Sequence, residues 1–149
     1  MGGILLMSLF DELDIEKTKV AAHTVLSEYR RLKMIARRPI QQKITVSYDS
    51  QPTSKSDVTP AIERAVVMKE YAAYEVERIE AAINSLSKKD YVEILELIYL
   101  DGYEKTDLEM CERMECSSST FYRKRNKALV QIAEALGCEV VTSIVPRGY

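Results

Sequence analysis

The chain has 149 residues, which corresponds to one domain, or to one small domain with an extension. Hydrophobic residues make up 46% of it and charged residues 30%, a balance that excludes a disordered polypeptide. With only five glycines and four prolines, an all-β chain with many tight turns is disfavoured. The net charge of −2 excludes a uniformly basic nucleic-acid coat, but it leaves room for a local basic face.

The three cysteines, Cys111, Cys116 and Cys138, form an odd set without a disulfide pattern, which indicates a reducing compartment. The apolar run at residues 2–10 lacks the basic start of a signal peptide and is far shorter than the ~20 residues of a membrane span. The sequence therefore predicts a frayed leader on a cytoplasmic protein that has no membrane contact.

One long N-terminal helix is predicted over residues 12–38, because apolar and small side chains recur there at alternating steps of three and four. Acidic residues at its start and basic residues at its end suit the helix dipole, and Pro39 ends it. We expect the stripe to form an intramolecular core, with a homodimer seam as the alternative. Its members are Ile15, Thr18, Ala22, Val25, Tyr29, Leu32 and Ala36.

Residues 39–59 are polar and are predicted to form a linker, although the alternation at residues 44–48 would also suit a short strand. Thr59 and Pro60 combine a capping hydroxyl with a proline at the first helical position. This pair predicts that a second helix begins at residue 60 and runs to about residue 86.

A weak capping pattern at residues 87–90 predicts a third helix, which Asp101 and Gly102 end. These elements place a helical C-terminal domain over residues 60–141, followed by a tail at residues 142–149. The predicted fold class is all-α: a long N-terminal helix, a polar linker and this C-terminal helical unit.

The end of the C-terminal unit has the clearest local signals. Thr106 and Glu109 form a stronger capping box that opens a short helix to Met114. A tight turn follows, and a longer helix with a basic start spans residues 118–136, with Gly137 as its C-cap. This order of short helix, turn and longer helix predicts a helix-turn-helix.

The longer helix divides into two sides on a helical wheel at ~100° per residue. The side expected to pack against the preceding helices carries Phe121, Ala128, Leu129, Ile132 and Leu136. The opposite, exposed side carries Ser119, Tyr122, Arg123 and Asn126. Positions beside the exposed side, or at the helix start, carry Ser118, Thr120, Lys124 and Lys127.

This division suits duplex DNA as the partner. Arginine and asparagine can make paired hydrogen bonds to guanine and adenine, and serine or tyrosine can add single contacts. Lysine, threonine and helix N-terminal amides can hold phosphate oxygens. We therefore expect base readout by Ser119, Tyr122, Arg123 and Asn126, and backbone contacts by Ser118, Thr120, Lys124 and Lys127. The alternative is a basic helix face that is merely solvated.

Several segments resemble the ArpU-type phage transcriptional regulators, whose C-terminal helix-turn-helix is similar to region 4 of sigma factors. The most specific is residues 117–129, supported by Ile83-Asn84-Ser85-Leu86 and Tyr99-Leu100. Lys17-Thr18, residues 29–33 and the loop at 44–48 resemble the family's N-terminal helix and linker. The resemblance implies a regulator, expected to activate late phage or prophage genes for packaging and host lysis, in the cytoplasm of a bacterial host.

Two residues depart from the family pattern. Glu115 stands in the turn where the family more often has glycine, so it must adopt a left-handed conformation or shift the turn. Arg125 falls on the packing side of the wheel, where such helices usually carry an apolar residue, and we expect it to snorkel along that face.

A second basic cluster at the end of the N-terminal helix is a candidate for phosphate contacts beside the main site, or for RNA polymerase. Its alternative is a solvated helix end favoured by the dipole. The cluster consists of Arg30, Arg31, Lys33, Arg37 and Arg38.

No catalytic, metal or cofactor site is predicted. The cysteine spacing does not match a zinc knuckle, His23 has no evident partner, and there is no glycine-rich phosphate loop. We therefore do not expect an enzyme. Two other classes stay open: a terminase small subunit-like DNA-binding protein, and a module that binds RNA polymerase or a sigma factor without reading DNA.

Overall fold

The computed structural model of the protein describes residues 12–40 and 55–142. Within those two ranges the chain forms helices and one isolated antiparallel bridge but no strand, which confirms the all-α fold class. The predicted leader at residues 2–10 and the alternating segment at 44–48 lie outside the described residues. The helices are α2 (Ile15–Ser27), α3 (Tyr29–Arg37), α4 (Lys55–Asn84), α5 (Lys89–Leu95), the π-helix η2 (Glu96–Leu100), α6 (Asp107–Met114) and α7 (Ser118–Leu136).

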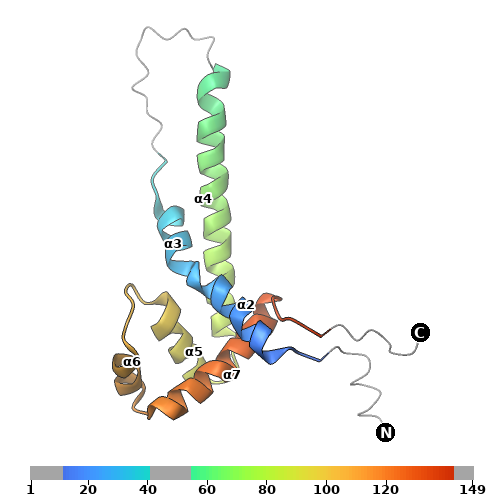
Figure 1. Cartoon of the computed structure of the whole chain (residues 1–149). Coiled ribbons are helices and arrows are strands. Elements are labelled where there is room, and N and C mark those ends of the chain that lie inside the picture. The colour runs from blue at the N-terminus through green and yellow to red at the C-terminus, as the bar shows by residue number, and fades with distance from the viewer. Residues whose placement is uncertain (1–11, 41–54, 143–149) are drawn as a thin grey trace, which may run out of the picture.

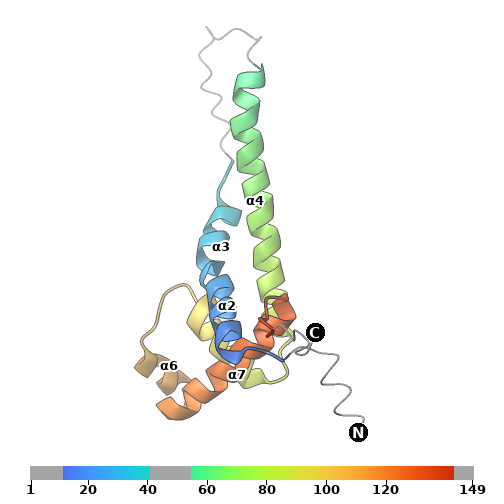
Figure 2. The ribbon, with the colours of Figure 1, turned by 45° about the vertical axis from the view of Figure 1, so that its right-hand side comes forward.

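The long helix α4 extends well beyond a cluster of shorter helices gathered at its C-terminal end (Figure 1). In both views α3 lies alongside α4, while α2 lies against α7 in the lower cluster (Figure 2). Helix α7 crosses beneath this cluster, and α6 lies near its N-terminal half. The predicted DNA-contacting helix is thus at the end of the molecule opposite the start of α4.

The hydrophobic core joins the N-terminal helices to the C-terminal ones. Its main cluster draws fully buried side chains from both parts of the chain, including Leu26, Tyr29, Ile79, Leu95 and Ile132. A smaller cluster lies between α5, α6 and α7 and consists of Ile94, Met110, Cys111 and Phe121. Helices α2 and α3 therefore belong to the same hydrophobic core as α7.

The N-terminal helix differs from its prediction, because the single helix expected over residues 12–38 is two helices. Glu28 separates them with φ −81° and ψ −10°, and its amide donates to Val25 O at 3.2 Å in a tightened turn. Glu28 keeps a right-handed conformation, so no glycine or proline in the sequence marked the point where the helix is interrupted. Since α2 packs on α7 and α3 packs on α4, the change of packing partner accounts for it.

Most of the predicted N-terminal stripe is used inside the chain. Thr18, Ala22 and Tyr29 are fully buried, and Val25 and Leu32 pack against the main cluster. Ile15, at the start of the stripe, is 46% exposed. These side chains thus serve the intramolecular core, as expected.

The second helix begins before its predicted start. Helix α4 starts at Lys55, inside the predicted linker, and Pro60 lies within it rather than at its first position. It ends at Asn84, close to the predicted end near residue 86. Proline removes one backbone donor and crowds the preceding turn, but near a helix start this affects few hydrogen bonds, so the helix continues through it.

The third helix also begins differently. The predicted helix is present and starts at Lys89, but Lys88 is its N-cap residue and makes no side-chain cap bond, so the capping box predicted at residues 87–90 is wrong. The Ser87 amide and hydroxyl instead donate to Gln131 Oε1 on α7, at 3.2 and 3.1 Å. The helix ends in a π-turn, in which the Asp101 amide donates to Glu96 O at 2.9 Å.

The C-terminal segment returns to the start of α2. Val141 forms an antiparallel bridge with Leu13, and the Asp14 amide donates to Val140 O at 2.8 Å. The buried Thr18 hydroxyl donates to Val140 O at 3.1 Å and accepts from the Val140 amide at 3.0 Å. The end of the described chain is thus tied to the first helix.

Candidate nucleic-acid interface

Helix α6 and the turn after it form as their sequence signals predicted. The Thr106 side chain accepts from the Glu109 amide at 3.2 Å, so the predicted N-cap at Thr106 and the start of the helix are confirmed. Glu115 adopts the left-handed conformation at φ 53° and ψ 44°, which is one of the two outcomes that the sequence left open for this position. The Cys116 amide then donates back to Cys111 O at 3.1 Å, which closes the turn and directs the chain into α7.

Helix α7 also has the predicted bounds. The Ser117 hydroxyl accepts from the Thr120 amide at 3.3 Å and caps the helix start. Gly137 ends the helix in the left-handed region at φ 74°, and the Cys138 amide donates to Ala133 O at 2.9 Å. Both ends are therefore set by local hydrogen bonds.

The predicted packing side of α7 is confirmed. Phe121 and Ile132 are fully buried, and the three other predicted core positions are buried as well. Those positions are Ala128, Leu129 and Leu136. The opposite side is therefore presented outward.

All of the predicted DNA-contacting side chains lie on or beside that outward side. The exposed ones are Ser118, Ser119, Arg123 and Lys127, and the half-buried ones are Thr120, Tyr122, Lys124 and Asn126. They gather over the first half of α7, where hydroxyl, amide and cationic groups offer both donors and acceptors.

Two of these side chains have acidic partners on other helices. The Lys124 ammonium lies 2.7 Å from Asp90 Oδ2 at the start of α5, and the Tyr122 hydroxyl donates to Asp107 at the start of α6. The hydrogen bond between Asp90 and Lys124 lowers the pKa of the Asp90 carboxyl and raises the pKa of the Lys124 ammonium. The hydrogen bond to Asp107 raises the pKa of the Tyr122 phenol.

Sequence analysis did not find these partners. Asp90 is 34 residues from Lys124 and Asp107 is 15 residues from Tyr122, so no helical spacing links them. Only the packing of α5 and α6 against α7 brings the carboxylates to the helix.

Arg125 occupies the edge of the packing side. Its side chain is half-buried, and its guanidinium carbon lies 4.9 Å from the centre of the Tyr122 ring. Its buried Nε has no hydrogen-bond partner in the part of the chain that the structure describes. It lines an open pocket of about 260 Å³ together with His23, Arg30 and Lys105.

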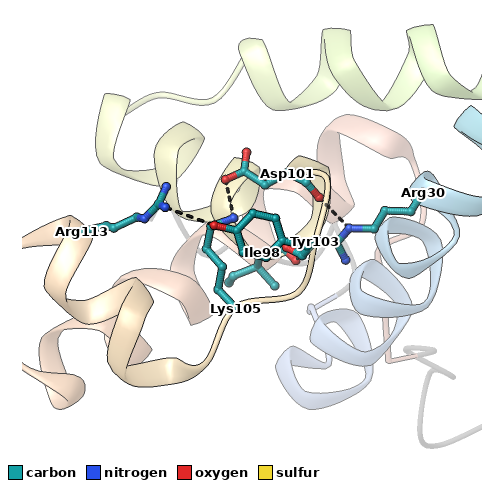
Figure 3. Close-up of polar contacts among 6 residues, drawn as sticks. All are labelled: Arg30, Ile98, Asp101, Tyr103, Lys105 and Arg113. Atoms are coloured by element: carbon teal, nitrogen blue, oxygen red, sulfur yellow. Dashed lines mark hydrogen bonds and ion pairs between the residues drawn. The ribbon is translucent and has the colours of Figure 1, made fainter.

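Arg30, from the predicted second basic cluster, binds the backbone instead of lying free. Its Nε donates to Asp101 O at 2.7 Å, and its Nη2 donates to Ile98 O at 3.0 Å and Tyr103 O at 3.3 Å (Figure 3). These carbonyls belong to the end of η2 and to the loop that leads to α6. Arg30 thus connects α3 to the end of η2 and to the loop that leads to α6.

The same loop is held from its other side. Lys105, whose side chain is only 1% exposed, lies 2.7 Å from Asp101 Oδ2 and 4.3 Å from the centre of the Tyr103 ring. Arg113 of α6 donates to the Tyr103 hydroxyl at 3.4 Å (Figure 3). The orientation of α6 therefore depends on contacts from three segments of the chain.

The other residues of the second basic cluster make fewer contacts with the rest of the protein. Arg31 forms an exposed ion pair with Glu28 at 3.3 Å, and Lys33 donates to the Tyr29 hydroxyl at 3.2 Å. Arg37 and Arg38 are exposed at the end of α3. Of the five residues, Arg30 has the clearest structural role.

Within residues 12–40 and 55–142, no group of three or more His, Cys, Asp or Glu side chains is arranged to hold a metal ion. Cys111, Cys116 and Cys138 are free, and burial raises the pKa of the Cys111 and Cys138 thiols. No helix in these ranges has the length and apolar character needed to cross a membrane.

Fold and site together define an all-helical protein in which a capped helix, a left-handed turn and a longer helix present a polar, partly basic face. Residues 58–133, just over half of the chain, match the family described as "Protein of unknown function (DUF1492)". The chain therefore belongs to this family.

A phage protein also resembles this chain over most of its length. The "Putative autolysin regulatory protein ArpU" of Streptococcus phage O1205 is 29% identical over 126 residues, which cover 85% of this chain and 91% of that protein. This match supports the resemblance to ArpU-type proteins, and it covers more of the chain than the family match does. No solved structure matches the chain.

Proposed function

We propose that this protein is a transcriptional regulator that binds a specific duplex DNA sequence through α7. The observation that carries the proposal is the two-sided character of α7: one side is buried in the core, and the other presents the predicted DNA-contacting residues. The name of the phage relative, a putative regulatory protein, supports a regulatory role. We further propose that it acts in the bacterial cytoplasm and activates late genes of a phage or prophage.

The proposed contacts follow from the position of each side chain on α7. B-form DNA has a major groove wide enough to admit a helix. Arg123 and Asn126 would make paired hydrogen bonds to base edges, and Ser119 and Tyr122 would add single ones. Arg123 is exposed and makes no ion pair among the described residues, so its guanidinium is available to a base without losing a protein partner.

Phosphate contacts would come from the start and the flanks of the same helix. Ser118 is the first residue of α7, and the backbone amides at a helix start can donate to the oxygens of a phosphate. Lys127 is exposed, while Thr120 and Lys124 are half-buried at the edges. These groups would set the register of α7 in the groove without reading sequence.

The first experiment is a selection of bound duplexes from a random DNA pool at about 100 mM salt, read by sequencing. We expect one motif to be enriched, and an inverted or direct repeat within it would indicate a homodimer on two half-sites. Enrichment of no motif, with binding that is lost at modest salt, would contradict specific DNA binding. RNA polymerase binding would then be the function to test.

A matched pair of variants tests the role of α7. We expect R123A to weaken binding to the selected site by about 1–3 kcal/mol and to relax the preference at one position. R64A is the control, because Arg64 is an exposed arginine on α4 and its removal changes the net charge equally. If folded R123A binds the selected site as tightly as R64A does, the assignment of α7 is wrong.

Salt dependence tests the proposed phosphate contact. K127A should weaken binding to all sequences and reduce the slope of log K against log salt by about 0.9. A slope equal to that of the unaltered protein would remove Lys127 from the contact set.

A further inference from the structure

The start of α7 carries two side chains that are already bound to carboxylates in the free protein. The Lys124 ammonium lies 2.7 Å from Asp90 Oδ2, in a pair whose side chains are 30% and 50% exposed. The Tyr122 hydroxyl donates to Asp107 Oδ2. Both carboxylates come from the first turn of a neighbouring helix, Asp90 from α5 and Asp107 from α6.

Asp90 offers Lys124 an anionic oxygen as a phosphate would, and Asp107 accepts from the Tyr122 hydroxyl as an acceptor on a base edge would. A carboxylate and a phosphate both offer anionic oxygens to an ammonium or a hydroxyl. The Lys124 ammonium cannot lie 2.7 Å from Asp90 and also hold a phosphate at the edge of the groove with full strength. A DNA contact by Lys124 or Tyr122 therefore competes with a contact within the protein.

Resting on the proposed DNA binding, we propose that Asp90 and Asp107 set the affinity of this site. Each carboxylate holds one α7 side chain in the free protein and releases it when the duplex binds. Asp90 restrains a phosphate-binding lysine, and Asp107 restrains a base-contacting tyrosine. They are regulating residues outside the DNA-contact surface and act through Lys124 and Tyr122.

The two carboxylates should affect salt dependence differently. A lysine that binds a phosphate releases one counterion from the DNA, but a carboxylate left behind without its partner attracts a cation in return. Exchange of Asp90 for a phosphate should therefore contribute little to the salt slope. The exchange at Tyr122 involves no cationic side chain, so its contribution to the slope is small in any case.

The test compares D90N with E93Q by measuring binding to the selected duplex as a function of salt. Glu93 is on the same helix three residues further on, and its replacement removes the same charge without touching Lys124. We expect D90N to bind about two- to fivefold more tightly than E93Q, the range for release of one exposed ion pair. Its slope should be steeper than that of E93Q by about 0.9.

A second pair of variants, D107N and E109Q, tests the tyrosine contact in the same assay. Both residues lie in the first turn of α6 and both changes remove one negative charge. We expect D107N to bind more tightly than E109Q by about two- to fivefold, with the same salt slope. Thermal unfolding of each variant checks that the helices remain folded.

A double-mutant cycle separates a specific effect from general electrostatics. In a K124Q background, D90N should have no advantage over E93Q, because no lysine remains to be released. Equal affinities and slopes for D90N and E93Q in the unaltered background would overturn the inference while leaving DNA binding intact. If the unaltered protein binds no specific duplex at all, the proposed function fails, and this inference fails with it.

Discussion

Substitution of Arg30 by alanine tests whether α3 stabilises the end of η2 and the loop that leads to α6. In the structure its guanidinium donates to Asp101 O at 2.7 Å, to Ile98 O at 3.0 Å and, at the exposed edge, to Tyr103 O at 3.3 Å. The first two carbonyls lie at the end of η2, where helical donors run out. A cation at that end also interacts favourably with the helix dipole.

The magnitude follows from these contacts. A hydrogen bond from a charged donor contributes about 1.5–3 kcal/mol, and contributions of neighbouring bonds do not add fully. Two good bonds and one longer, exposed bond give an expected loss of about 2–4 kcal/mol for R30A. That is a large part of the roughly 5–15 kcal/mol by which a domain is stable, yet it leaves most of the protein folded.

Urea denaturation followed by circular dichroism is the assay. With a slope near 2 kcal/mol/M, R30A should lower the midpoint by roughly 1–2 M. R31A is the control, because Arg31 makes only an exposed ion pair with Glu28 at 3.3 Å and should change the stability by at most about 0.5 kcal/mol. Equal midpoints for R30A and R31A would refute the structural role of Arg30.

Three further predictions concern stability. E115G should raise the free energy of unfolding by about 0.5–1 kcal/mol, measured by thermal denaturation, because glycine adopts the left-handed conformation without a Cβ penalty. T18V should lower it by about 1–3 kcal/mol and speed hydrogen exchange at the Val140 amide, since both bonds between the two residues are lost; unchanged exchange would contradict this. Burial and the hydrogen bond to Glu80 raise the pKa of Tyr29, so the folded protein retains this proton above the unfolded value near 10. Stability should therefore fall as pH rises above about 10, and less steeply in Y29F; parallel urea midpoints for both proteins at about pH 8 and pH 11 would exclude this contribution.

The elements around the candidate interface were predictable because their signals are local. A threonine three residues before a glutamate, a glycine after the last apolar position, and apolar residues at steps of three and four each act within one or two helical turns. Helix α6, helix α7 and its buried side therefore follow from the sequence alone, whereas the structure decided between the two conformations left open for Glu115. The same signals mark which α7 side chains face outward.

Elsewhere local signals were insufficient. Thr59 and Pro60 have the pattern of a helix start, but α4 continues through them from Lys55. Ser87 has the composition of a cap, but it binds Gln131 of α7 instead. A capping residue stabilises a helix start by only about 1 kcal/mol. At residues 59 and 60 the continuation of α4 outweighs this preference, and at Ser87 the contact with Gln131 does.

The roles of the charged residues were decided by tertiary structure. Arg30 belongs to a basic run that suggests a binding surface, yet it donates to carbonyls about 70 residues away in the chain. Lys124 and Tyr122 were recognisable as α7 surface residues, but their partners Asp90 and Asp107 come from other helices. Hydrogen bonds and ion pairs depend on distances of about 3 Å, which packing sets and which no spacing along one helix contains. Local sequence signals are therefore enough to predict which face of α7 is exposed. The packing of α5 and α6 decides which carboxylates bind Lys124 and Tyr122 on that face.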